Sequence, residues 1–236
     1  MGASVGPALS RALEAKFPGQ VKTMGVKYPA SIQGAVSGAM NPPDAEGSKD
    51  MTAKAKEIMS SCPESKIVLG GYSQGAEQVH GALQKGNLGQ DGGKIAVALT
   101  YGDPLAGERT KAFGGWGCLP DTRAKVFCNA GDGVCGGAFS ISAAHLSYTT
   151  NGDIAKGAAF AVQIINEGKL EPVQGQCKYA FSAAGMRGTG GSGGSLKGVP
   201  KGKGSKGSGG SAAPPAAEPA AAAPEEAAPG RYIIDG

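Results

Sequence analysis

Several residue types and patterns that mark common classes of protein are scarce in this chain. It has two histidines and no Cys-x-x-Cys pair, too few ligands for a zinc site of the usual mixed spacing. No apolar run approaches the length of a membrane span. Lys and Arg number 17 against 15 Asp and Glu before residue 180, and 6 against 4 after it, far from the charge density of a nucleic-acid binder. We therefore expect no metal, no membrane span and no nucleic-acid partner.

The five cysteines all lie in the first 177 residues. Without zinc spacing, disulfides in an oxidising compartment are the expected use, and an odd number leaves one cysteine unpaired. The first residues, Met1 to Gly6, lack the basic region and apolar core of a signal peptide. We therefore expect a secreted protein whose beginning is missing from this sequence.

The composition changes near residue 180. Residues 1–180 alternate apolar segments with turn residues, and this length is enough for one globular domain with a substantial core. Residues 181–236 are rich first in Gly, Ser and Lys and then in Ala, Pro and Glu. We expect this second part to be a disordered, low-complexity tail.

Strands and helices are predicted to alternate along the domain. Strands are expected at 21–28, 66–69, 95–101 and 125–128, and helices at 6–16, 51–59, 76–83 and 154–165, whereas 29–43 is expected to be a loop. This order indicates an α/β fold, with a parallel sheet covered on both faces. In such sheets the ligands sit beyond the carboxyl ends of the strands.

The stretch Gly71-Tyr72-Ser73-Gln74-Gly75 follows one of these strands and precedes a helix. It has the G-x-S-x-G pattern, in which a sharp turn exposes a nucleophilic serine. The alternative is a serine in an ordinary Gly-rich turn. The strand before and the helix after favour a catalytic Ser73.

A serine nucleophile needs an imidazole as base and a carboxylate to orient that imidazole. His80 lies seven positions after Ser73, about 10 Å along the same helix, and is expected to be a surface or packing residue. His145 follows the last predicted strand, which gives the order Ser, Asp, His found in hydrolases of this architecture. Asp132 is the favoured acid; its rival Asp103 is expected to brace a turn.

Three motifs occur in order and together resemble fungal cutinases. They are Gly-Gly-Tyr-Ser-Gln-Gly-Ala at 70–76, Tyr-Gly-Asp-Pro at 101–104, and Cys-Asn-Ala-Gly-Asp-Gly-Val-Cys at 128–135, followed ten residues later by His-Leu-Ser-Tyr at 145–148. The resemblance runs from about residue 5 to 165. It implies a small lidless α/β-hydrolase with a three-layer sandwich, secreted, monomeric and without a cofactor. Ser73 would be its nucleophile, His145 its base and Asp132 its orienting acid.

The resemblance also assigns the oxyanion hole. One donor would be the amide of Gln74, and the other a Ser or Thr after the family's first core strand. This sequence begins after that turn, so the first strand, which lies between the 21–28 and 66–69 strands in the family, is expected to be missing. An upstream cysteine that would pair with Cys62 is missing with it.

The remaining assignments also follow the resemblance. It implies that Cys128 and Cys135 are bridged, which leaves Cys118 and Cys177 to pair. Phe139 and Ile141 correspond to the apolar rim that meets the acyl chain or polymer, although packing beneath their loop is an equal alternative.

The predicted function is hydrolysis of carboxylic esters in cutin-like polyesters and short-chain esters. Two alternatives remain. Acetylxylan esterases share much of this fold, and a chain without its first strand would be an inactive fragment, because unpaired backbone on two strands is costly.

Overall fold

The computed structural model describes residues 2–107, 115–135, 137–138, 140–168, 170, 177–178 and 230–236. The strands are β1 (Val21–Gly25), β2 (Lys66–Tyr72), β3 (Val97–Tyr101), β4 (Ala124–Phe127) and β5 (Arg231–Asp235). The α-helices are α1 (Val5–Glu14), α2 (Ile32–Met40), α3 (Glu46–Ser61), α4 (Gln74–Ala82) and α6 (Asp153–Glu167).

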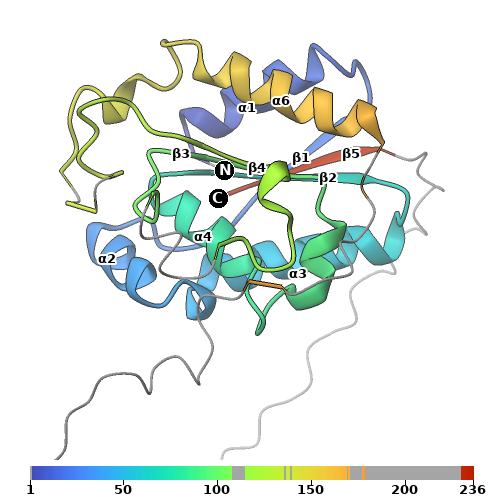
Figure 1. The fold of residues 1–236 in the computed structure, drawn as a ribbon, viewed down its shortest axis with the longest axis horizontal. Helices are drawn as coiled ribbons and strands as arrows, with labels where there is room; N and C mark the ends of the chain where they lie inside the picture. Colours follow the sequence, from blue (N-terminus) through green and yellow to red (C-terminus); the bar gives the residue numbers. More distant parts are fainter. Residues whose placement is uncertain are drawn as a thin grey trace, which may run out of the picture.

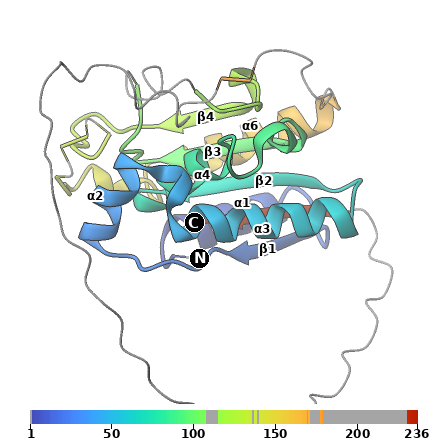
Figure 2. The ribbon, with the colours of Figure 1, turned by 90° about the horizontal axis from the view of Figure 1, so that it is seen from below.

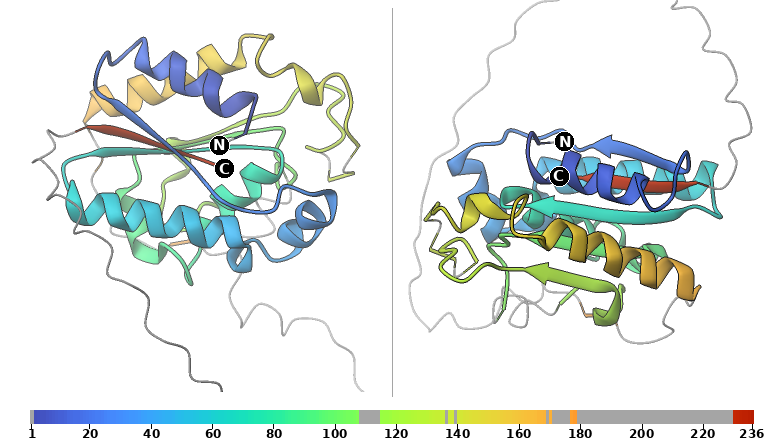
Figure 3. Two further views of the ribbon diagram at one scale, coloured as in Figure 1. Left: turned by 180° about the vertical axis from the view of Figure 1, so that it is seen from behind. Right: turned by 90° about the horizontal axis from the view of Figure 1, so that it is seen from above.

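The five strands form one parallel sheet in the order β1-β5-β2-β3-β4. Helices α1 and α6 cover one face, and α2, α3 and α4 lie on the other (Figure 1). Views from below and above show the strands side by side between the helices (Figure 2, Figure 3). The predicted three-layer α/β fold is confirmed.

Alternate side chains of the central strands fill two apolar cores, one on each face of the sheet. Val68 and Leu99 pack against α1 and α6, whereas Ile67 and Leu69 pack in the cluster that includes α3 and α4. β3 is buried at every position because helices cover both of its faces, which explains its unbroken apolar sequence.

β5 corrects the expectation that the strand between β1 and β2 is missing. Five residues near the other end of the chain fill that position and pair with both neighbours, from Val21↔Arg231 and Lys66↔Arg231 onward. Neither neighbour is left with the unpaired backbone on which the inactive-fragment alternative rested. The prediction of a disordered tail is wrong for residues 230–236, and residues 179–229 lie outside the described part.

Helix α2 corrects a second prediction, because residues 29–43 were expected to form a loop. Ser31 caps the helix, its Oγ accepting a hydrogen bond from the Gly34 amide at 3.0 Å. Ile32, Val36 and Met40 share one side of the helix, at a spacing of four residues, and are exposed. The helix is rich in small residues, and its Gly38 lies so close to α4 that a Cβ there would be 2.5 Å from a Glu77 carboxylate oxygen.

The two disulfides flank β4 in the sequence, since Cys118 precedes the strand and Cys128 directly follows it. The structure joins Cys118 to Cys177 and Cys128 to Cys135, the pairs expected from the sequence. Cys62 is the free cysteine. Its Sγ lies 3.5 Å from the hydroxyl of Tyr232 in β5.

Candidate active site

Ser73 stands at the turn between β2 and α4. Its backbone has φ +55° and ψ −119°, and it is the one residue other than glycine with a positive φ within the described ranges. Such a conformation is strained for a residue with a side chain and persists where the surroundings enforce it. The Ser73 amide is held by a 2.9 Å hydrogen bond to the carbonyl of Tyr101 in β3.

The glycines on either side of Ser73 allow the turn to be this tight. A Cβ at Gly71 would lie 2.4 Å from the carbonyl oxygen of Gly75. A Cβ at Gly75 would lie 2.1 Å from the carbonyl oxygen of Gly236, just after β5. Both positions therefore exclude any side chain, as the G-x-S-x-G pattern predicts.

Three side chains form a continuous hydrogen-bonded chain: Ser73 from the β2–α4 turn, and Asp132 and His145 from the connection between β4 and α6. His145 Nε2 lies 3.0 Å from Ser73 Oγ. On the other side of the ring, His145 Nδ1 lies 2.9 Å from one oxygen of Asp132 and 3.1 Å from the other. Asp132 and His145 are 6% and 2% exposed, so bulk water does not compete for these bonds.

Asp132 is kept ionised by its partners. Burial alone would raise its pKa, but hydrogen bonds from Tyr148, His145 and the Val134 amide lower the pKa of this carboxyl below its usual value. The Tyr148 hydroxyl donates at 2.7 Å and itself accepts from the Asn129 amide. The Cys128–Cys135 disulfide closes the short loop that carries Asp132.

The ring of His145 is fixed by its surroundings. Tyr72 stacks on it with ring centroids 4.9 Å apart, and the Tyr72 hydroxyl donates to the His145 carbonyl at 2.8 Å. Gly102 has φ +55° and lies close to the ring, since a Cβ there would be 2.7 Å from His145 Cε1. The imidazole is therefore held by the stacked tyrosine and has no room to shift toward Gly102.

A cavity of about 370 Å³ opens at Ser73. Its wall includes Gln74, whose backbone N–H belongs to the first turn of α4, where amides lack helical partners. The first turn of α1 and the carboxyl end of β5 also line it, as do Ile32 and Ile141. Ile141 is 62% exposed, and Phe139 lies outside the described residues.

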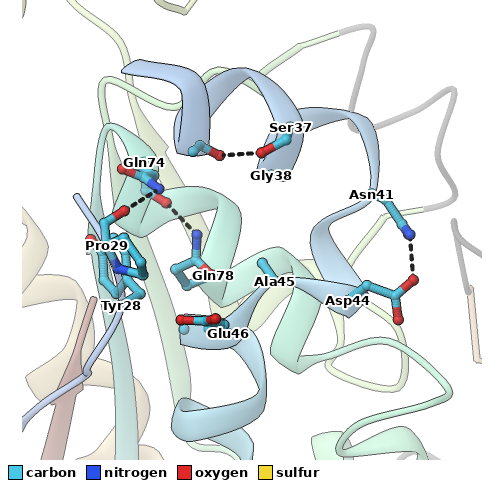
Figure 4. Close-up of a pocket in the computed structure, with 12 residues that line it drawn as sticks. Tyr28, Pro29, Ser37, Gly38, Asn41, Asp44, Ala45, Glu46, Gln74 and Gln78 are labelled. Carbon is cyan, nitrogen blue, oxygen red and sulfur yellow. Dashed lines mark hydrogen bonds between the residues drawn. The ribbon is translucent and has the colours of Figure 1, made fainter. Parts of the chain in front are cut away.

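A second hollow of about 330 Å³ lies among α2, α3 and α4 and shares Tyr28 and Gln74 with the first (Figure 4). Two of its glutamine side chains donate to backbone carbonyls: Gln74 Nε2 to that of Pro29, and Gln78 Nε2 to that of Gln74. The Gln74 side chain also accepts from the Ser31 amide at 3.2 Å. These bonds tie α4 to the segment before α2 and so support the wall of the cavity at Ser73.

The two residues rejected as catalytic from the sequence lie together elsewhere. His80 Nε2 is 2.8 Å from Asp103 Oδ2, and both side chains are buried. Asp103 also accepts from Thr100 and from the Leu105 amide, so it braces the turn after β3.

Sequence reasoning did not assign roles to Tyr72 and Tyr148. Both stand within the quoted motifs, Tyr72 just before the serine and Tyr148 three residues after His145. Aromatic residues are common in cores, so their spacing alone did not reveal the hydrogen bonds that their hydroxyls make.

Comparisons with known proteins place the chain among related sequences. The model of the cutinase family matches residues 1–165. A cutinase of Monilinia fructicola is 35% identical over 164 residues, which cover 70% of this chain and 75% of that protein. Cutinase cut1 of Trichoderma harzianum is 35% identical over 167 residues, which cover 70% of this chain and 62% of that protein.

A solved structure is similar as well. It is a Trichoderma reesei cutinase in complex with a phosphonate inhibitor, 32% identical, with a TM-score of 0.60. The match covers 70% of this chain and 69% of the other.

Proposed function

Because the chain belongs to the cutinase family and is a carboxylic ester hydrolase, we propose that it cleaves esters through an acyl-enzyme on Ser73. The observation that carries this proposal is the chain of hydrogen bonds from Ser73 through His145 to Asp132. Ser73 is the nucleophile, His145 the general base and Asp132 the residue that orients the imidazole.

The reaction begins when Ser73 Oγ attacks the ester carbonyl and gives its proton to His145 Nε2, 3.0 Å away. Asp132 stabilises the imidazolium that forms. The negative oxygen of the tetrahedral intermediate lies at the N-terminus of α4, where the Gln74 amide donates to it. His145 then protonates the leaving alcohol. Water attacks the acyl-enzyme in turn, with His145 again as the base, and the acid is released.

The surroundings of the cavity favour an apolar ester. Ile32 and Ile141 line it and are 78% and 62% exposed, and Leu146, the residue after His145, is exposed as well. Large exposed apolar side chains near a site mark a surface that meets an apolar partner. We assign the substrates to cutin-like polyesters and short-chain esters, in preference to acetylated xylan, whose sugar backbone is polar.

The proposed setting is extracellular. Two disulfides support it, because such bonds persist in oxidising compartments. The proposed enzyme is a monomer in dilute solution and uses no cofactor, since the steps above need only side chains and water.

The nucleophile is tested with p-nitrophenyl butyrate. Ser73→Ala should lower kcat/KM by about 10³-fold or more, because the covalent step is lost. Ser61→Ala, an exposed serine on α3, is the matched control and should keep full activity. Turnover that survives Ser73→Ala would rule out the assignment.

The substrate is tested separately. Ile32→Ser and Ile141→Ser should slow release of products from an insoluble polyester several-fold and leave soluble p-nitrophenyl butyrate hydrolysis within about twofold of the unaltered chain. If release of acetate from xylan exceeded activity on longer acyl esters, the acetylxylan alternative would replace this one.

A further inference from the structure

β5 occupies a channel between β1 and β2 and forms hydrogen bonds along both sides. It pairs with β1 from Val21↔Arg231 to Gly25↔Asp235, and with β2 from Lys66↔Arg231 to Gly70↔Asp235. The pairing continues beyond the strand, where the Val26 amide donates to the Asp235 carbonyl and the Gly236 amide to the Gly70 carbonyl. The channel therefore accepts one extended segment with both edges satisfied.

The side chains of β5 complete both cores. Ile233 is 1% exposed and packs with the α1 and α6 cluster. Ile234 and Tyr232 pack with the cluster on the opposite face. Arg231 lies over the ring of Phe17, with its guanidinium carbon 3.9 Å from the centroid. A strand with these contacts is specific to this channel in sequence and in register.

The contacts of β5 are independent of its covalent connection. Cys62 and Gln20, which contact its side chains, are 170 and 211 positions away in sequence. Between Lys178, the preceding described residue, and Gly230 lie only residues outside the described part. In sequence, 51 residues separate Lys178 from Gly230, and a chain of that length gives a tethered strand an effective concentration on the order of millimolar or lower.

We propose that the β1–β2 channel also accepts the Arg231–Asp235 strand of a second copy of this chain, so that two copies exchange β5 and form a closed dimer. Reciprocal exchange preserves every hydrogen bond and apolar contact that β5 makes in the monomer. The monomer and the dimer therefore differ mainly in the entropy of the chain that connects β5 to the rest of the domain. The monomer dominates in dilute solution. The dimer grows as the protein concentration approaches the effective concentration.

The first test restores activity by mixing two inactive full-length chains. One carries Ser73→Ala with β5 intact. The other keeps Ser73 but carries Ile234→Pro, which removes a backbone donor and an apolar contact from β5. After joint refolding, hydrolysis of p-nitrophenyl butyrate should rise at least about tenfold above the sum of the separate chains and should saturate with the Ser73→Ala chain.

A matched control separates exchange from non-specific stabilisation. A donor that carries both Ser73→Ala and Ile234→Pro should give no rescue, because it has neither a nucleophile nor a strand to lend. Rescue by this double variant, or no rescue by the intact-strand donor up to millimolar concentration, would overturn the proposal.

The second test does not depend on ester hydrolysis. Unaltered chains labelled with ¹⁴N and ¹⁵N are refolded together from about 10 μM to 1 mM, a range chosen around the expected effective concentration, and are examined by native mass spectrometry. Mixed dimers should increase with concentration, and the Ile234→Pro chain refolded alone should form none. A chain that is monomeric throughout, or dimers that persist with Ile234→Pro, would contradict exchange of β5 even if the esterase assignment holds.

Discussion

Two buried aspartate–histidine pairs lie in this molecule, and only one of them reaches a serine. Asp132 and His145 are 2.9 Å apart, and Asp103 and His80 are 2.8 Å apart. Both aspartates follow the carboxyl ends of neighbouring strands, β4 and β3. In both, burial would raise the pKa of the carboxyl, but hydrogen bonds and the charge of the histidine lower it.

The pairs differ in what else the imidazole ring contacts. The second nitrogen of His145 is 3.0 Å from Ser73 Oγ, at a cavity of about 370 Å³. His80 instead stacks on Trp116, with ring centroids 4.1 Å apart. A buried pair of this kind is therefore not a sign of catalysis by itself. The serine and the open space beside it make the difference.

The largest expected effect comes from breaking the pair at the serine. Asp132→Asn should lower kcat/KM on p-nitrophenyl butyrate by about 10³- to 10⁴-fold, because the imidazole loses the group that fixes its tautomer and stabilises its charge. Steady-state kinetics at pH 8 measures this. Activity above one tenth of the unaltered chain would mean that Asp132 does not orient His145.

The same substitution in the other pair should cost stability. Asp103→Asn should lower the free energy of unfolding by about 3 kcal/mol, because breaking a buried pair leaves His80 poorly satisfied. Urea unfolding measures the loss. The activity of each folded molecule should stay within about threefold, and a greater loss of activity without loss of stability would contradict a structural role for this pair.

Asp235 in β5 is buried like Asp132 and Asp103, but its Oδ1 has no hydrogen-bond partner within the described residues. Burial raises the pKa of this carboxyl to about 6, and the positive amino terminus acts in the opposite direction. Burial raises the pKa values of Tyr28 and Tyr101, and the charge of Asp235 raises them further.

The raised pKa makes stability fall with rising pH. The unfolded pKa is about 3.9, so the stabilisation is complete below about pH 4, is lost as the pH rises through 6 and is constant above that. The difference amounts to about 3 kcal/mol. Asp235→Asn should remove this pH dependence and should be more stable than the unaltered chain at pH 7. Urea unfolding at pH 4 and at pH 7 measures both effects. Equal pH dependence in both chains would contradict a buried, unpaired acid.

The smallest expected effect comes from changing Tyr148, which donates to Asp132 of the Asp132–His145 pair. Tyr148→Phe removes the hydrogen bond to Asp132 Oδ2. Such a bond to a charged group contributes about 1.5 kcal/mol, so kcat/KM should fall about tenfold. The pKa of Asp132 should rise, because one of the hydrogen bonds that lower it is lost, and NMR titration of the carboxyl carbon measures this. Tyr72→Phe, which would remove a bond to a backbone carbonyl instead, should leave the pKa of Asp132 in place.

Local patterns in the sequence predicted much of the fold. The strand before Ser73, the glycines beside it and the order of Asp132 and His145 are short-range features, and the structure brings these three side chains together. Helix α2 was missed because glycine and serine, which are poor helix formers, stand between its apolar residues and gave the segment the composition of a loop.

β5 could not have been predicted in the same way. Arg231–Asp235 is a five-residue stretch after a long low-complexity segment, and its pairing depends on a channel that β1 and β2 create from residues far away. Strand pairing is set by context more than by intrinsic propensity. The buried Asp103–His80 pair was likewise hidden, since no local pattern links a helix residue to a turn 23 positions later.

The place of β5 in the sheet also governs when the molecule can fold. β5 is synthesised after every strand that it pairs with, and its partner Val21 precedes Arg231 by 210 positions. Domains usually begin to fold from their N-terminal side as the chain emerges, and pairings between distant residues form slowly. β5 therefore cannot close the β1–β2 channel until these 210 positions have been translated, and until then the channel is accessible to chaperones.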